Sequence, residues 1–109
     1  MKLPGADHVV VDERKVREYL LSRSHPIGRF KAAVFARAGF RAQNWREFVS
    51  AVRVLAVQGD AMPGEPNKYG VKYLVSGTIM GPTGKLEVIT VWLIPTEGGP
   101  PRLVTVYPR

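Results

Sequence analysis

Apolar positions in the first half of the chain recur at the spacing of helices. Asp12 is placed to cap a first helix, because it precedes a face formed by Val16, Tyr19 and Leu20. The segment Ser22–Pro26 ends that helix, since its proline cannot donate a backbone hydrogen bond and disfavours helical geometry in the residue before it. The histidine that precedes this proline is therefore expected in a loop.

A second helix is predicted from residue 27 or 28 to residue 38. Gly39 ends it, and a left-handed glycine there would place Phe40 and Phe35 in the two positions that touch in a Schellman ending. The expected inward stripe is Phe30, Ala33, Val34 and Ala38.

A third helix is predicted between Asn44 and Gly59. Asn44 and Glu47 have the spacing of a capping box, and the glycine suits a helix end. Its expected core stripe is Phe48, Val52 and Leu55.

The second half of the chain changes to the β-branched and aromatic residues of strands. Residues 60–67 are rich in turn formers and are expected to form a loop. The predicted strands are Tyr69–Met80, Leu86–Ile94 and Leu103–Tyr107. Residues 81–84 suit a hairpin, so the sheet is antiparallel. The strand 86–94 is apolar on both faces, which predicts a central strand with both faces covered or one face serving as an interface.

These elements predict an α+β fold in which three N-terminal helices pack on a C-terminal antiparallel sheet of three to four strands. With 109 residues, the chain is expected to form one domain, 1–109, with a helical half at about 12–59 and a sheet half at about 69–108. No apolar run reaches the length of about 18 residues that spans a bilayer, and the first residues lack a signal-peptide core. We therefore expect a cytoplasmic protein without a membrane partner.

Charge is distributed unevenly along the sequence. The net charge is +7, and residues 19–46 hold six bases and no acid. A one-sided cationic surface favours polyanions, so nucleic acid, a nucleotide or an acidic partner protein are candidate ligands. A basic charge that serves only solubility is the alternative. The bases expected to bind nucleic acid are Arg29, Arg37 and Arg41.

Candidate catalytic residues lie in two distant segments. His25 falls between basic residues and could transfer a proton at a phosphodiester, although the same position also suits a loop residue that caps the following helix. Arg29 and Lys31 occupy the first turn of the second helix, where a phosphate is favourable. In the last strand, Thr105 and Tyr107 share a face and Arg102 stands at the start. Threonine and tyrosine are also simply good strand formers.

The sequence gives little support for disulfides, metal sites or serine and cysteine nucleophiles. The chain has no cysteine, which excludes disulfides, zinc-thiolate sites and cysteine nucleophiles. Two separated histidines and few clustered acids make no metal-ligand set, and no serine has a nucleophile-elbow context. No cofactor or metal is expected.

Four segments together resemble a known family: Leu3–Ala6, His25–Lys31, Asn44–Trp45 and Pro101–Pro108. The family comprises small bacterial domains of unknown function, found as stand-alone proteins and at the C-termini of toxin-like chains. In layout, such domains are similar to the barnase, EndoU, colicin and RelE-like group of metal-independent ribonucleases. In that group a histidine of the helical half meets polar residues of late strands, and RNA is cleaved by its own 2′-hydroxyl.

Two hypotheses follow from the sequence. By the resemblance, the protein is a toxin-like ribonuclease without a cofactor, with His25 as general base or acid, Lys31 and Arg102 as phosphate binders, and Thr105 and Tyr107 as hydrogen-bond donors in the transition state. Alternatively, it is a non-catalytic basic module that binds nucleic acid or a partner protein, such as an antitoxin or immunity protein. If the first holds, these five side chains should converge on one cleft.

Overall fold

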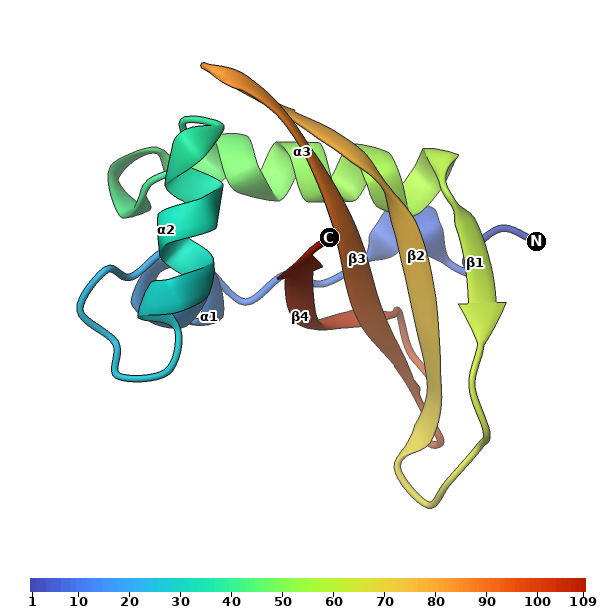
Figure 1. Cartoon of the computed structure of the whole chain (residues 1–109). Coiled ribbons are helices and arrows are strands. Elements are labelled where there is room, and N and C mark those ends of the chain that lie inside the picture. The colour runs from blue at the N-terminus through green and yellow to red at the C-terminus, as the bar shows by residue number, and fades with distance from the viewer.

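The structure is a computed structural model that describes residues 1–109. Helices lie mainly in the first half of the chain and strands in the second (Figure 1), which confirms the mixed α+β class. The helical elements are a 3₁₀ turn at Ala6–His8, α1 at Glu13–Lys15, a π-helical segment at Val16–Leu20 that continues α1, α2 at Arg29–Arg37, a 3₁₀ turn at Ala42–Asn44, and α3 at Trp45–Gln58. The strands are β1 at Asp60–Pro63, β2 at Gly70–Gly81, β3 at Gly84–Pro95 and β4 at Arg102–Pro108.

The four strands form one antiparallel sheet in the order β1-β2-β3-β4. β3 is an interior strand, as its apolar sequence predicts, and the tight hairpin between β2 and β3 pairs Gly81 with Gly84. The prediction of a loop for the whole of residues 60–67 is wrong, because Asp60–Pro63 pairs with β2. Backbone pairing with β2 and the burial of Ala61, which is 4% exposed, stabilise this short strand despite its turn-forming residues.

The hydrophobic core lies between α3 and one face of the sheet. Phe48, Val52 and Leu55 of α3 are buried there, as predicted, in a cluster with Val75, Ile79, Val88, Trp92 and Val106 of the strands. Trp92 is fully buried, and its indole N–H donates to the hydroxyl of Thr90 at 2.8 Å. Its role is structural.

The helices are not all stacked on the sheet. Only α3 crosses it, whereas α1, the π-helical segment and α2 lie together beside the β4 edge (Figure 1). The alternate side chains of β3, namely Ile89, Val91 and Leu93, face the opposite side of the sheet, which α3 does not cover.

Two local helix signals behave as expected and two do not. Gly39 has a φ of 91°, and the N–H of Phe40 donates to the carbonyl of Phe35 at 3.1 Å, which confirms the Schellman ending. The Asp12 carboxylate accepts the N–H groups of residues 14 and 15, as a cap should. Asn44, by contrast, does not cap α3, because its side chain bonds backward to residues 39 and 41.

The predicted inward stripe of α2 holds for Ala38 but is wrong for Phe30. Phe30 is 66% exposed, while Ala32, Phe35 and Ala38 are buried. The rings of Phe35 and Phe48 lie 5.1 Å apart, edge to face, and this contact sets the rotation of the helix. Phe30 is thereby left on the surface.

Candidate functional site

His25 begins the turn that leads into α2. Its Nδ1 accepts the backbone N–H groups of Ile27 and Gly28, both at 3.0 Å, and its carbonyl accepts the N–H of Arg29. Pro26, with no N–H to satisfy, occupies the first position of this turn. The side chain is therefore a helix cap, as one of the two interpretations of the sequence holds.

This cap fixes the proton of the imidazole. Two N–H donors directed at Nδ1 require a lone pair there, so we assign the proton of the neutral ring of His25 to Nε2. Nε2 has no partner within the protein, so the ring can donate a hydrogen bond to a ligand. To accept a proton as a general base, the imidazole would have to release both backbone N–H groups.

Tyr19, on the π-helical segment, supports the histidine. The two rings meet edge to face with centroids 4.9 Å apart. Gly28 makes this approach possible, because a Cβ atom there would overlap the carbonyl oxygen of Tyr19 and lie 3.1 Å from its Cδ1. The start of α2 thus packs directly on the π-helical segment.

Lys31 joins the helical half to the last strand. Its Nζ donates to the hydroxyl of Thr105 at 2.9 Å and lies 4.3 Å from the ring centroid of Tyr107. The same Nζ is 5.4 Å from the ring centroid of Tyr19. No carboxylate forms an ion pair with this half-buried ammonium. Its charge is balanced only by a hydroxyl and the faces of two aromatic rings.

The polar residues of β4 share one face of the sheet. Thr105 pairs with Val91, Tyr107 with Ile89, and Arg102 with Leu93, all on the side away from α3. Thr105 is 9% exposed and Tyr107 is 47% exposed. Thr105 and Tyr107 thus share a face, as expected, and the irregularity opposite Val91 and Trp92 brings Arg102 to the same face.

No single cavity holds the five predicted side chains, because Lys31, Thr105 and Tyr107 line none. Two shallow cavities of about 410 Å³ each lie beside the histidine and Arg102. One is lined by His25, Tyr19, Glu18 and Arg14, the other by Arg102, Leu103, Pro100 and Val10, and both are lined by Asp12 and Lys15. Lys15 also donates to the carbonyl of Val104 at 2.9 Å. The structure therefore brings His25, Lys31, Thr105 and Tyr107 into one chain of contacts through Tyr19, with Arg102 in the adjoining cavity.

One carboxylate beside the histidine has a shifted pKa. The hydrogen bond from Arg14 to Glu18, at 2.9 Å, and the charge of that guanidinium lower the pKa of Glu18 below its ordinary value. The Glu18 side chain consequently stays ionised as the pH falls toward the ordinary range of a glutamate. It is unsuited to donating protons near neutral pH.

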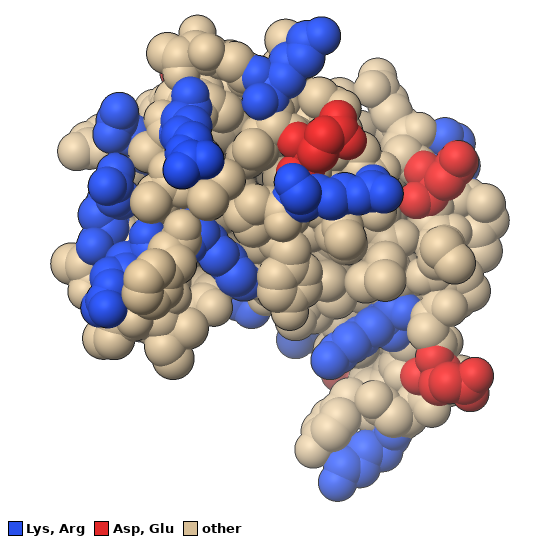
Figure 2. Space-filling model, viewed as in Figure 1, with Lys and Arg blue, Asp and Glu red and all other residues tan.

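The other predicted bases lie on the surface around α2. Arg29 and Arg37 are exposed, and the guanidinium of Arg29 lies 4.7 Å from the ring centroid of Phe30. Arg41 lines a different cavity, together with Arg17 and Arg23. Figure 2 shows Lys and Arg side chains gathered over the end of the molecule that holds α1 and α2, largely without Asp or Glu between them.

Tyr19 and Lys15 are site residues that the sequence did not indicate. Tyr19 was expected on one face with Val16 and Leu20, which are buried, whereas Tyr19 itself is half-buried and contacts His25. No pattern in the sequence signals a π-helical turn. Lys15 gave no signal either, because its partner is a backbone carbonyl 89 residues away.

Two further features of the structure concern ligands and membranes. The structure gathers no group of three or more His, Asp or Glu side chains. Its helices lack the combined length and apolar character that a membrane crossing needs.

Comparisons with known proteins support the fold. One solved structure, described as a contact-dependent growth inhibition toxin–immunity protein complex from Klebsiella pneumoniae 342, contains a chain that superimposes with a TM-score of 0.63. The two chains are 18% identical, and the match covers 92% of this chain and 99% of that one. This likeness concerns the fold. No curated protein sequence matches the chain.

A family comparison gives the classification. Residues 2–109 match the family described as a domain of unknown function, DUF6883. The match covers the helices, the sheet and every residue of the site described above. The chain therefore belongs to the DUF6883 family.

Proposed function

We propose that the protein is a toxin-like, metal-independent endoribonuclease. The observation that carries this proposal is the contact between Lys31 and Thr105, which joins residues 74 positions apart and places an ammonium without a carboxylate partner beside a hydroxyl and the face of the Tyr107 ring. Such a group of donors, open to solvent at Tyr107, suits a phosphodiester. The fold of the toxin–immunity complex chain is consistent with a toxin-like role.

The reaction would use the substrate's own nucleophile. The 2′-oxygen of the RNA bonds to phosphorus as the bond to the 5′-oxygen breaks. The 2′-hydroxyl passes its proton to solvent water and the 5′-oxygen takes one from solvent water, which yields a 2′,3′-cyclic phosphate and a 5′-hydroxyl. Negative charge builds on the phosphorus oxygens in between, so groups aimed at them accelerate the reaction.

Each residue of the site has a distinct role in this proposal. Lys31 balances the charge on the phosphorus oxygens, and Tyr107 and Thr105 donate hydrogen bonds to them. His25 donates from Nε2, because its Nδ1 is committed to the helix cap. Arg102, in the adjoining cavity, binds a neighbouring phosphate.

Replacing His25 separates its two roles. His25→Asn keeps an acceptor for the backbone N–H groups but removes the Nε2 donor, so the melting temperature should stay near that of the wild type while cleavage falls about 10²-fold. His25→Ala removes both functions and should also cost about 1 kcal/mol of stability. Thermal unfolding and cleavage of labelled RNA measure the two effects. Full activity in His25→Asn would leave the histidine as a cap only.

Salt should weaken RNA binding steeply. With three to four phosphates contacted, the logarithm of the affinity for a single strand should fall with the logarithm of salt with a slope of about −2 to −3. Removing Arg29, Arg37 or Arg41 one at a time should make the slope shallower by about 0.7 for each one that contacts a phosphate. Fluorescence anisotropy with a 2′-deoxy oligonucleotide, which resists cleavage, measures the slope. A flat dependence would argue against phosphate recognition.

A second candidate function is that of a non-catalytic binding module. It is favoured by the apolar surface beside the site, where Ile27 is 69% exposed and Phe30 66% exposed. Large exposed apolar side chains next to a basic surface suit an acidic protein partner, such as an inhibitor of the immunity type that covers the site. RNA binding without cleavage would favour this module over the enzyme.

A further inference from the structure

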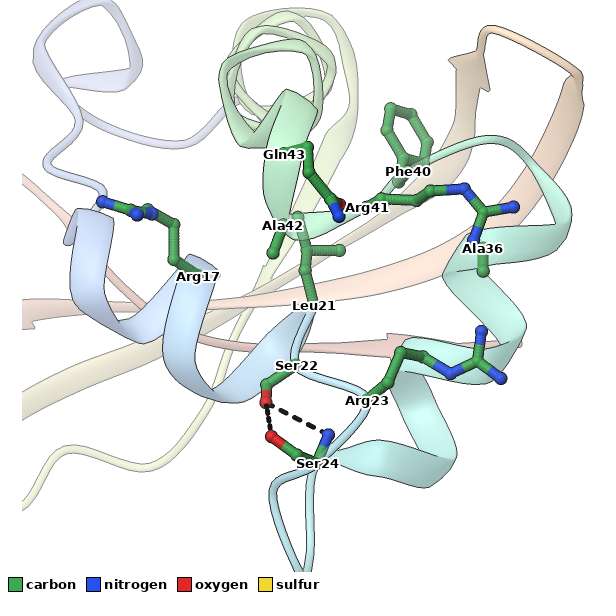
Figure 3. A pocket seen from close by; sticks show the side chains of 10 residues that line it. All are labelled: Arg17, Leu21, Ser22, Arg23, Ser24, Ala36, Phe40, Arg41, Ala42 and Gln43. Atoms are coloured by element: carbon green, nitrogen blue, oxygen red, sulfur yellow. Dashed lines mark hydrogen bonds between the residues drawn. The ribbon is translucent and has the colours of Figure 1, made fainter.

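A second group of cations lies in a cavity that the proposed reaction does not use. The cavity has a volume of about 420 Å³ and lies between the π-helical segment, α2 and the 3₁₀ turn at Ala42–Asn44 (Figure 3). Leu21 and Phe40, which are 2% and 1% exposed, form its apolar floor. Polar and charged side chains form its rim: Arg17, Ser22, Arg23, Ser24, Arg41 and Gln43. This size and lining suit a small polar ligand.

Arg23 and Arg41 have no carboxylate partner. The three ion pairs of the protein use other bases, one of which is Arg17, bound to Glu13 at 2.7 Å. Figure 3 shows Arg17 pointing away, whereas the guanidinium groups of Arg23 and Arg41 extend to the same side, over Ala36. Two like charges without a counter-charge repel each other, and a bound anion would relieve that repulsion.

Two serines of the loop before α2 also line this cavity. The hydroxyls of Ser22 and Ser24 are hydrogen-bonded at 3.2 Å, and the N–H of Ser24 also donates to Ser22 at 3.4 Å. The loop is thereby held in a compact form with both serines at the rim (Figure 3). Guanidinium groups bind phosphate oxygens well, and hydroxyls near an apolar floor can hold the attached nucleoside.

We propose that this cavity binds the phosphate of a nucleotide through Arg23 and Arg41, with the nucleoside over Leu21 and Phe40. Residues 22–24 line this cavity and residue 25 contacts Tyr19, so the two sites are separated by one short loop. The bound nucleotide is thus a part of the RNA strand outside the cleaved bond. The assignment of the bound nucleotide to an RNA strand rests on the proposed function, whereas nucleotide binding itself does not.

Adenosine 5′-monophosphate is a direct probe of the cavity. Isothermal titration should show that Arg23→Gln with Arg41→Gln weakens its binding about tenfold or more. Arg53→Gln with Lys68→Gln removes the same charge from exposed positions outside the cavity, and should change the affinity less than about twofold. Adenosine without phosphate should bind more weakly than the monophosphate.

The outcomes separate the cavity from the ribonuclease. The cavity proposal is overturned if the Arg23/Arg41 and Arg53/Lys68 double variants lose equal affinity for the nucleotide. It is also overturned if the wild type binds no nucleotide at millimolar concentration. If the Arg23 and Arg41 variants alone lose the nucleotide but the wild type leaves RNA intact, the cavity stands and the ribonuclease fails. If the same two substitutions weaken the binding of a 2′-deoxy oligonucleotide, one RNA strand occupies both the cavity and the cleavage site. If they leave its binding unchanged, that assignment is overturned and a free nucleotide is the ligand.

Discussion

Replacing Lys31 by methionine is expected to lower the rate of RNA cleavage by about 10³-fold. Methionine keeps most of the length and apolar stem of the side chain but removes the ammonium that bonds to Thr105 and lies over Tyr107. No other cation contacts that hydroxyl, so nothing replaces the lost charge at the phosphorus oxygens. Single-turnover cleavage of a labelled RNA measures the effect.

A matched variant controls for the loss of charge. Lys68→Met removes an ammonium that also lies over a tyrosine ring, 5.1 Å from the ring centroid of Tyr69, but stands in the loop before β2. It should cleave at a rate within about twofold of the wild type, since a remote surface charge contributes little. A Lys31→Met protein that is folded and cleaves at the wild-type rate would remove Lys31 from the proposed mechanism.

Gly28→Ala is expected to destabilise the protein by about 3 kcal/mol or more, which lowers its melting temperature by more than about 10 °C. The new Cβ would overlap the carbonyl oxygen of Tyr19, a backbone atom that cannot move without the π-helical segment. The start of α2 must then separate from that segment. Because this contact also holds His25 against Tyr19, cleavage should fall in the protein that remains folded.

Gly84→Ala is the matched control for this substitution. A Cβ at Gly84 meets no atom within 4 Å, and its backbone is outside the left-handed region. Its melting temperature should change by less than about 5 °C, which circular dichroism can resolve. Similar stability of Gly28→Ala and Gly84→Ala would show that the approach of α2 to Tyr19 is not rigid.

The parts of the fold that follow from short-range sequence signals could be predicted. Gly39 ends α2 with the expected φ, and Asp12 caps α1, because each signal acts within a few residues. The interior position of β3 also follows from its continuous apolar run. These features depend on local chemistry that the sequence displays directly.

Features that depend on distant contacts could not be predicted. Phe30 is exposed because the packing of Phe35 on Phe48 determines the rotation of α2, and helical spacing alone allows either orientation. β1 exists because β2 offers it free backbone groups. In both cases tertiary structure overrides the local preference.

The sequence indicated candidate residues and one of their contacts, but not the rest of their geometry. It suggested His25, Lys31, Thr105 and Tyr107, with a helix cap as one of two roles for the histidine, yet only the structure shows that the ammonium bonds to a threonine. Arg23 belonged to the basic run without a role of its own. Arg23 and Arg41 line one cavity because of the way the π-helical segment packs against α2, and no sequence pattern predicts that packing.

Purified protein incubated with total RNA in excess EDTA shows whether the chain is a metal-independent ribonuclease. We expect cleavage that persists in EDTA and leaves 2′,3′-cyclic phosphate and 5′-hydroxyl ends, which mass spectrometry identifies. Lys31→Met should slow this cleavage by about 10³-fold, whereas Lys68→Met should not. RNA that stays intact, or cleavage that EDTA stops, would contradict a metal-independent ribonuclease.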